Sequence, residues 1–232
     1  MGSPISLDDN EKKMLVPFFT TVCIHTFLSH LSSTSIWVKG LSKILPIICL
    51  CIFILDNGKQ FLSQHHRVQK LLAGLLLSAA GDTLLLMDNR RIFVGGAASF
   101  ALAHCVYSWV FGFKPLNLRA GGLIGAVVTA GWTLLSLCLK TKEALLLSCY
   151  CALIGVMAWR ANSQVLFHSQ RLSARATGAV GAWLFMISDF ILATNLLCFP
   201  IPFQRIIVMT TYYMAQLLIT LAILRESKNK VD

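Results

Sequence analysis

Residues 37–55 read WVKGLSKILPIICLCIFIL, an almost unbroken apolar run with two lysines near its start. At a helical rise of 1.5 Å per residue, such a run is about long enough to cross the roughly 30 Å hydrocarbon core of a bilayer. Its residues do not alternate between apolar and polar, as the strands of a membrane β-barrel do. The run therefore predicts a membrane-spanning helix, in which the backbone groups are hydrogen-bonded within the segment.

Similar runs occur along the whole chain and predict a bundle of about eight membrane-spanning helices. The predicted spans are 14–30, 37–55, 68–88, 91–113, 121–139, 143–161, 175–196 and 203–224. The connections between them are short, and none could form a soluble domain. We therefore expect residues 1–232 to form a single, all-α, integral membrane domain.

The composition supports a membrane protein over a soluble or nucleic-acid-binding one. The chain has 232 residues, of which 56% are hydrophobic and only 13% charged, whereas a soluble domain carries about 25% charged residues. The net charge of +10 does not indicate nucleic acid, because the basic residues flank the apolar runs instead of forming one patch. Of the eight cysteines, six lie within apolar runs and no Cys-x-x-Cys spacing occurs, so we interpret the cysteines as packing residues.

The distribution of Lys and Arg predicts the orientation. With eight spans both termini lie on one side, and that side carries thirteen of the 20 Lys and Arg residues, against seven on the other. Because cytoplasmic loops are enriched in Lys and Arg, we expect both termini to be cytoplasmic.

Two carboxylates, Asp82 and Asp189, lie deep inside apolar runs, in the matching contexts SAAGDTLLL and MISDFILA. A carboxylate in hydrocarbon costs several kcal/mol and is retained only with a partner, a water-filled cavity or a function. Asp82 lies six residues before the non-cytoplasmic end of its predicted span, and Asp189 seven. Both would therefore sit about 9–10 Å below that surface, and we predict that they share one catalytic site. The alternative is that each acid has a separate structural hydrogen bond.

Other polar residues in the runs are candidates for binding substrate or supporting the site. Lys43 reaches a similar level, where it could pair with one carboxylate and keep it ionised; alternatively it snorkels to the interface. The other candidates are His104, Tyr107, Tyr212, Tyr213 and Gln216. For some of them, packing is the simpler interpretation. Few histidines lie within spans, so we expect no metal, and no cofactor fingerprint is present.

Six stretches of the sequence, taken in order, resemble the YhhN-like lysoplasmalogenases, in particular the vertebrate members of the endoplasmic reticulum membrane. The resemblance extends from about residue 15 to residue 224 and is carried by LSKILPIICL, SAAGDTLLL, FALAHCVYSWVFGF, MISDFILATN, CFPIP and IVMTTYYMAQLLITL. The paired acids of the family correspond to Asp82 and Asp189.

The resemblance implies an eight-span enzyme that hydrolyses the vinyl ether bond of lysoplasmalogens, giving a fatty aldehyde and glycerophosphocholine or glycerophosphoethanolamine. Two carboxylates suit this reaction without a metal, since one can protonate the double bond while the other stabilises the resulting cation. The expected partners are a lysophospholipid substrate and membrane lipid. The alternative function is a proton-coupled transporter of lipids or small molecules, because such proteins also carry acids within their spans.

Overall fold

The computed structural model describes residues 9–31, 35–87, 89–139, 141–166 and 173–229. In these residues the regular structure is entirely helical, which confirms the predicted all-α class. Backbone contacts divide the chain into two compact units, one formed by Met1–Val106 with Ile223–Asp232 and the other by Tyr107–Ala222. Each unit is described separately, and the single membrane domain stays a prediction.

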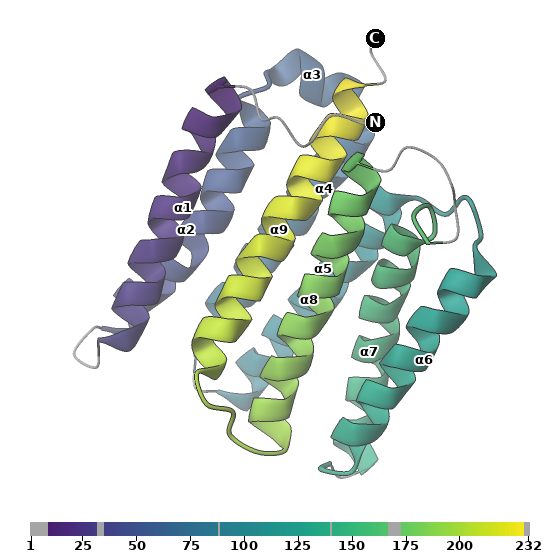
Figure 1. Ribbon diagram of the computed structural model, residues 1–232. Helices are drawn as coiled ribbons and strands as arrows, with labels where there is room; N and C mark the ends of the chain where they lie inside the picture. The colour runs from purple at the N-terminus through teal and green to yellow at the C-terminus, as the bar shows by residue number, and fades with distance from the viewer. Residues whose placement is uncertain (1–8, 32–34, 88, 140, 167–172, 230–232) are drawn as a thin grey trace. The chain divides into compact units, whose positions relative to one another are not determined.

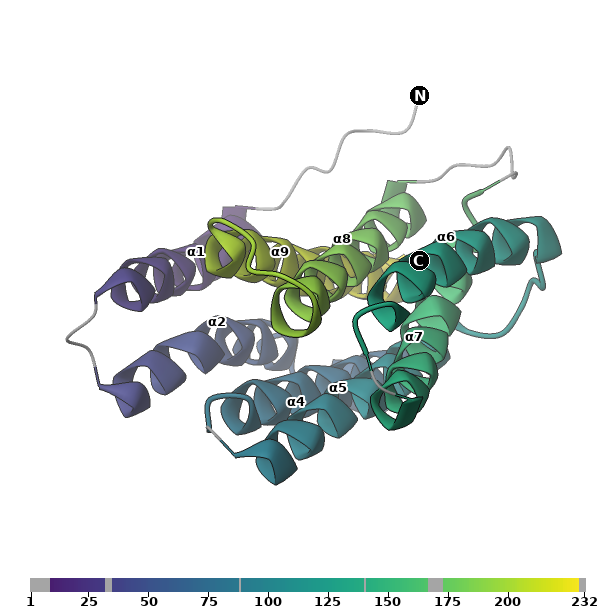
Figure 2. The same cartoon turned by 90° about the horizontal axis from the view of Figure 1, so that it is seen from below.

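The first unit is built from the N-terminal helices together with parts of α5 and the end of α9. Its helices are α1 (Asp9–His30), α2 (Ile36–Leu55), α3 (Lys59–Gln64), α4 (His66–Leu84) and the first part of α5 (Arg90–Phe111). Helix α1 packs along α2, and α2 packs on α4, as both views show (Figure 1, Figure 2). The short helix α3 forms the connection between the second and third predicted spans, where the sequence predicted only a loop.

The second unit contains the remaining helices. They are α6 (Leu118–Ser136), α7 (Thr141–Asn162), α8 (Ser173–Leu197) and most of α9 (Gln204–Lys228). Helix α6 packs along α7, and α7 packs on α8 (Figure 1). Asn117 starts α6, because its side-chain oxygen accepts a hydrogen bond from the Ala120 amide at 3.1 Å, which satisfies an amide that the helix itself leaves unpaired.

Eight helices of the described chain lie at the eight predicted spans, and six of them are long and apolar enough to cross a membrane. The two others are α1 and α4. Helix α4 carries Arg67, Lys70 and Asp82 within its 19 residues, and α1 begins with a charged segment and contains His25. Six candidate spans establish a multi-pass membrane protein, and the count of eight stays a prediction.

Ion pairs in the first unit join helix ends that the predicted topology places on the same side. Arg67, near the start of α4, contacts Glu226 at 2.7 Å, and Lys228 at the end of α9 contacts Glu11 near the start of α1 at 3.0 Å. These three ends are all cytoplasmic in the predicted arrangement, so the contacts agree with alternating spans. The terminal residues 1–8 and 230–232 lie outside the described residues, and the cytoplasmic side stays a prediction.

The predicted span 68–88 extends four residues beyond the end of its helix. Helix α4 ends at Leu84, and residues 85–87 form a turn; residue 88 lies outside the described chain. Asn89 then accepts a hydrogen bond from the Arg91 amide at 2.9 Å at the start of α5. Hydropathy does not distinguish a helix from an apolar turn, so the predicted span included turn residues.

The interpretation of all cysteines as packing residues is wrong for two of them. Cys138 and Cys198 follow the ends of α6 and α8 and form a disulfide with a Cα–Cα distance of 5.3 Å, a usual value for such bonds. The six cysteines within apolar runs, including Cys23 and Cys51, are free. The two bonded residues lie at the ends of predicted spans, where the sequence offers no pairing signal.

Candidate active site

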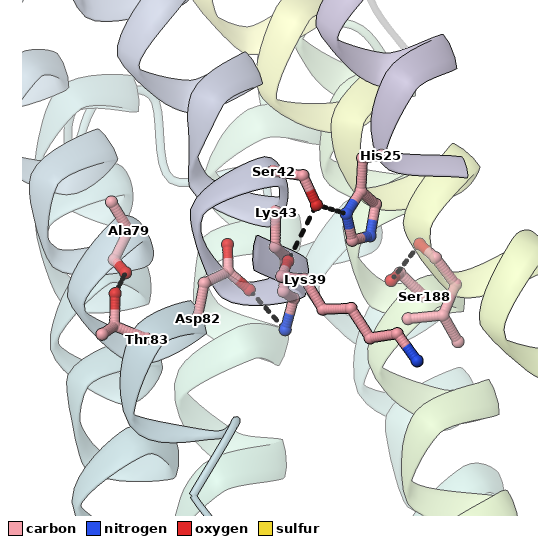
Figure 3. Close-up of polar contacts among 9 residues, drawn as sticks. His25, Lys39, Ser42, Lys43, Ala79, Asp82, Thr83 and Ser188 are labelled. Atoms are coloured by element: carbon pink, nitrogen blue, oxygen red, sulfur yellow. Dashed lines mark hydrogen bonds and ion pairs between the residues drawn. The ribbon is translucent and has the colours of Figure 1, made fainter. Parts of the chain in front are cut away.

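Asp82 is buried on α4, with 2% of its surface exposed, and forms an ion pair with Lys43 of α2. The distance from Lys43 Nζ to Asp82 Oδ1 is 2.9 Å (Figure 3). Of the two alternatives for Lys43, pairing with a carboxylate is the one observed. The side chain keeps 16% exposure, so the cation compensates the buried charge without being fully buried itself.

Two glycines hold Asp82 in place by allowing α4 and α5 to touch. A Cβ added at Gly81, the residue before Asp82, would lie 2.7 Å from the Phe100 ring and 3.2 Å from the Gly96 carbonyl oxygen. The backbones therefore meet at Gly81 and Gly96, as expected of small residues at membrane helix contacts. This contact fixes the position of the α4 backbone next to Asp82.

A second polar contact joins α2 to a third helix at Ser42, the residue before Lys43. Ser42 Oγ donates to the Lys39 carbonyl oxygen at 2.9 Å and lies 3.0 Å from His25 Nδ1 of α1 (Figure 3). His25 and Ser42 are both buried. We call the ion-paired Lys43 and Asp82 and the hydrogen-bonded Ser42 and His25 the Lys43 cluster; its two contacts join α2 to α4 and to α1.

Asp189, on α8 in the second unit, has a different kind of partner. The Tyr150 hydroxyl of α7 donates a hydrogen bond to Asp189 Oδ2 at 2.6 Å. Tyr150 was not among the predicted site residues. The sequence did not single it out, because the other three tyrosines of the chain also lie within predicted spans. We call these two residues the Tyr150–Asp189 pair.

Four of the predicted supporting residues meet elsewhere in the second unit. Tyr107 donates to Gln216 Oε1 at 2.7 Å, and neither side chain is exposed. Phe185 joins them, with its ring 5.5 Å from Tyr212 in an edge-to-face arrangement, and Tyr212 lies 5.4 Å from Tyr213. This aromatic cluster packs α5, α8 and α9 together, and Phe185 lies one helical turn before Asp189.

The two acids lie at different distances from the ends of their helices, and their equal depth below the membrane surface stays a prediction. Asp82 lies two residues before the end of α4, about 3 Å, whereas Asp189 lies eight residues before the end of α8, about 12 Å. The difference arises because the predicted third span included turn residues. Asp82 belongs to the first unit and Asp189 to the second, and their shared site stays a prediction. His104 is fully buried on α5, and its role also stays a prediction.

Acidic, histidine and cysteine side chains do not gather as metal ligands would. Within the described ranges, no three of them lie close enough to hold an ion. The chemistry that the residues can support is therefore best derived from the Lys43 cluster and the Tyr150–Asp189 pair. Independence from metal stays a prediction for the purified protein.

Comparison with known proteins identifies similar chains over the whole sequence. The model of the YhhN family matches residues 38–223. The human protein named lysoplasmalogenase TMEM86A is 39% identical over 234 residues, covering 100% of this chain and 97% of its own. Lysoplasmalogenase TMEM86A of Bos taurus is 38% identical over the same shares, and human lysoplasmalogenase TMEM86B is 35% identical over 95% of this chain and 90% of its own. No solved structure matches the chain.

Proposed function

Because the chain belongs to the YhhN family, we propose that it is a lysoplasmalogenase, an enzyme that hydrolyses the vinyl ether bond of choline or ethanolamine lysoplasmalogens. The products are a fatty aldehyde and glycerophosphocholine or glycerophosphoethanolamine. The observation that carries the proposal is the similarity, over nearly the full length of both chains, to proteins named for this activity. The same similarity favours hydrolysis over the proton-coupled transporter.

Vinyl ether hydrolysis sets clear requirements for the site. A proton is added to the β-carbon of the double bond, which leaves an oxocarbenium ion. Water then adds to that cation, loses a proton, and the hemiacetal formed breaks down to aldehyde and alcohol. The reaction needs a neutral acid to supply the first proton and a negative charge to stabilise the cation. Glycosidases distribute two carboxyl groups in a similar way around an oxocarbenium-like transition state.

The ion pair with Lys43 suits Asp82 for the negative charge. A carboxylate that contacts an ammonium group at 2.9 Å is stabilised in its ionised form. In that form it can stabilise the oxocarbenium ion and orient the attacking water. A negative charge at Asp82 also leaves the neutral, proton-donating role to the second carboxyl group.

The general acid is then Asp189, and Tyr150 supports it by fixing the carboxyl group. The Tyr150 hydroxyl donates to Oδ2, and we assign to Oδ1, the other oxygen of the carboxyl group, the proton that goes to the substrate. After the proton has left, Asp189 can take back a proton from the attacking water. Tyr150 thus acts through Asp189 as a positioning residue and is not itself a catalytic residue.

Replacing Tyr150 with Phe is expected to lower kcat by about 10- to 100-fold while KM changes little, because a positioned carboxyl group loses its orientation but the substrate contacts remain. The measurement is aldehyde release by purified variants at equal amounts of folded protein. The unfolding temperature should move little, since Tyr150 and Asp189 are both only partly buried.

Tyr107→Phe is the matched control, because it removes the same hydroxyl from a tyrosine of the same unit. There the change leaves the buried Gln216 Oε1 without its donor, which costs about 1–3 kcal/mol of stability. We therefore expect Tyr107→Phe to lower the unfolding temperature, whereas Tyr150→Phe should leave it nearly unchanged. The reverse pattern, with Tyr150→Phe losing stability and keeping kcat, would assign Tyr150 a purely structural role.

The proposed function is tested with protein purified in detergent, where transport cannot occur. We expect fatty aldehyde to form from lysoplasmalogen and no product to form from the saturated ether lysolipid, which lacks the double bond that accepts the proton. The saturated ether should bind and inhibit instead. Comparable cleavage of an ester lysophospholipid would contradict the proposal, because it would require acyl transfer to a nucleophile.

The disulfide supports a location in the endoplasmic reticulum membrane with the ends of α6 and α8 in the lumen. Disulfides persist in oxidising compartments and are rare in the cytosol. Cys138 and Cys198 lie at the ends that the Lys and Arg distribution predicts to be non-cytoplasmic. Two independent properties, charge and redox chemistry, thus favour the same orientation with cytoplasmic termini.

Labelling of thiols in cells should reveal this orientation. In Cys138→Ser, Cys198 becomes a free thiol, and we expect a membrane-impermeant maleimide to label it only after the internal membranes are permeabilised. Asn229→Cys, at the exposed end of α9, is the control and should react when only the plasma membrane is opened. Labelling of Cys198 under that milder condition would place the disulfide end in the cytosol and contradict the orientation.

A further inference from the structure

A groove of about 450 Å³ lies between α6 and α7 in the second unit. This volume is within the range of small-molecule sites. The groove is lined mainly by apolar and small residues, from Gly121 and Trp159 at one end to Trp132 and Ser148 at the other. We call it the α6/α7 groove. The eleven residue steps from Gly121 to Trp132 correspond to about 16 Å along the helix, so the groove is long relative to its volume.

Glycine residues leave open space in the groove, and the indole ring of Trp159 closes one end. A Cβ added at Gly125 would meet no heavy atom within 4 Å, so the groove is open at this position. At Gly121 an added Cβ would instead lie 2.9 Å from the Trp159 ring. The indole of Trp159 therefore rests on the backbone of α6 and forms an end wall, fixed by its hydrogen bond to the Asn117 carbonyl oxygen at 2.9 Å.

The opposite end of the groove lies beside the Tyr150–Asp189 pair. Cys151, which lines the groove, is the residue after Tyr150. On α6, a Cβ added at Gly131 would lie 3.4 Å from the ring of Phe190, the residue after Asp189, and Trp132 follows Gly131. Near this end of the groove, α7 therefore contacts α8 through the Tyr150–Asp189 hydrogen bond, and α6 approaches α8 at Phe190.

A polar atom without a partner marks the same end. Trp132 lines the groove, and its Nε1 atom is buried and has no hydrogen-bond partner within the described part of the chain. Buried donors are nearly always satisfied in folded proteins, so an unpaired one calls for an acceptor from outside the chain. The groove thus has an unsatisfied donor at the end where α6 approaches Phe190 of α8, and apolar walls beyond it.

We infer that the α6/α7 groove binds the single hydrocarbon chain of the lysolipid substrate, with the Trp132 indole facing an oxygen of the glycerol ether. The inference rests on the proposed function. It assigns the vinyl ether to the end beside Asp189 and the chain terminus to the end at Trp159. The length of the groove then limits the length of the hydrocarbon chain that fits, so the enzyme is selective for the chain length of its substrate.

Gly125→Leu tests the inference, because the new side chain fills open space in the middle of the groove. A chain that passes position 125 then clashes with the new side chain, so kcat/KM for a long-chain lysoplasmalogen should fall on the order of tenfold. A short-chain substrate that ends before position 125 should be unaffected. The readout is the ratio of kcat/KM for the long and the short substrate.

Gly122→Leu is the matched control on the same helix. A Cβ at Gly122 also meets no heavy atom within 4 Å, but this residue does not line the groove. We expect the chain-length ratio to stay at the wild-type value. Equal ratios in both variants and the wild-type protein would overturn the inference, whereas failure of the wild-type protein to release aldehyde from either substrate would overturn the proposed function instead.

A binding measurement on the wild-type protein avoids any effect of substitution on folding. A saturated ether lysolipid with a photoreactive group at the chain terminus should bind without being cleaved and crosslink near Trp159 and Gly121. An analogue with the group near the glycerol should crosslink near Trp132. Adducts confined to other helices, or spread evenly over all of them as for bulk lipid, would contradict the assignment.

Discussion

Asp189→Asn should lower the rate of aldehyde release by about 10²- to 10⁴-fold, the usual contribution of a general acid, and Asp82→Asn should lower it to a similar extent. The amide keeps the shape of the side chain but can neither donate the acid proton nor hold the negative charge. Both variants should still insert and fold. The measurement is the initial rate on lysoplasmalogen with purified protein, at amounts matched by folded fraction.

Asp56→Asn is the matched control for these two changes. Asp56 is an exposed residue directly after α2, so the same loss of a carboxylate there should leave the rate at the wild-type level. Near-normal turnover by folded Asp82→Asn or Asp189→Asn would remove that residue from the mechanism. Loss of activity in only one of them would show that the two acids do not share the reaction.

Lys43→Met is expected to destabilise the protein by about 3–5 kcal/mol, because it leaves the buried Asp82 carboxylate without its cation. Activity of the remaining folded protein should also fall, since Asp82 then lacks the cation that compensates its negative charge at the site. Thermal unfolding in detergent, followed by tryptophan fluorescence, and aldehyde release measure the two effects separately.

Two further variants separate charge compensation from packing. Lys43→Arg keeps the positive charge and should retain more stability than Lys43→Met. The double variant Lys43→Met with Asp82→Asn removes both charges, so it should recover stability without recovering activity. If Lys43→Met unfolded at the wild-type temperature, the 2.9 Å contact would not contribute to stability. Another group would then have to compensate the negative charge of Asp82.

Helix locations followed from the sequence to within a few residues, because crossing a bilayer requires long apolar runs and hydrogen bonds within each segment. Helix α2 occupies Ile36–Leu55 where 37–55 was predicted, and α7 occupies Thr141–Asn162 where 143–161 was predicted. The unusual burial cost of Asp82 and Asp189 was equally visible in the sequence. The end of α4 was not, because turn residues 85–87 are as apolar as the helix before them.

The partners of the two acids were decided only by the tertiary structure. Each acid contacts a residue of a different helix, Asp82 with Lys43 and Asp189 with Tyr150. The disulfide likewise joins Cys138 and Cys198, which are 60 residues apart. Such contacts depend on which face each helix turns toward its neighbours. In a helix of a soluble protein, the polar face shows which side is turned toward solvent. A membrane helix is apolar on nearly every side, so its sequence does not show which side faces a neighbouring helix. Packing alone therefore determines whether a carboxylate meets a lysine or a tyrosine.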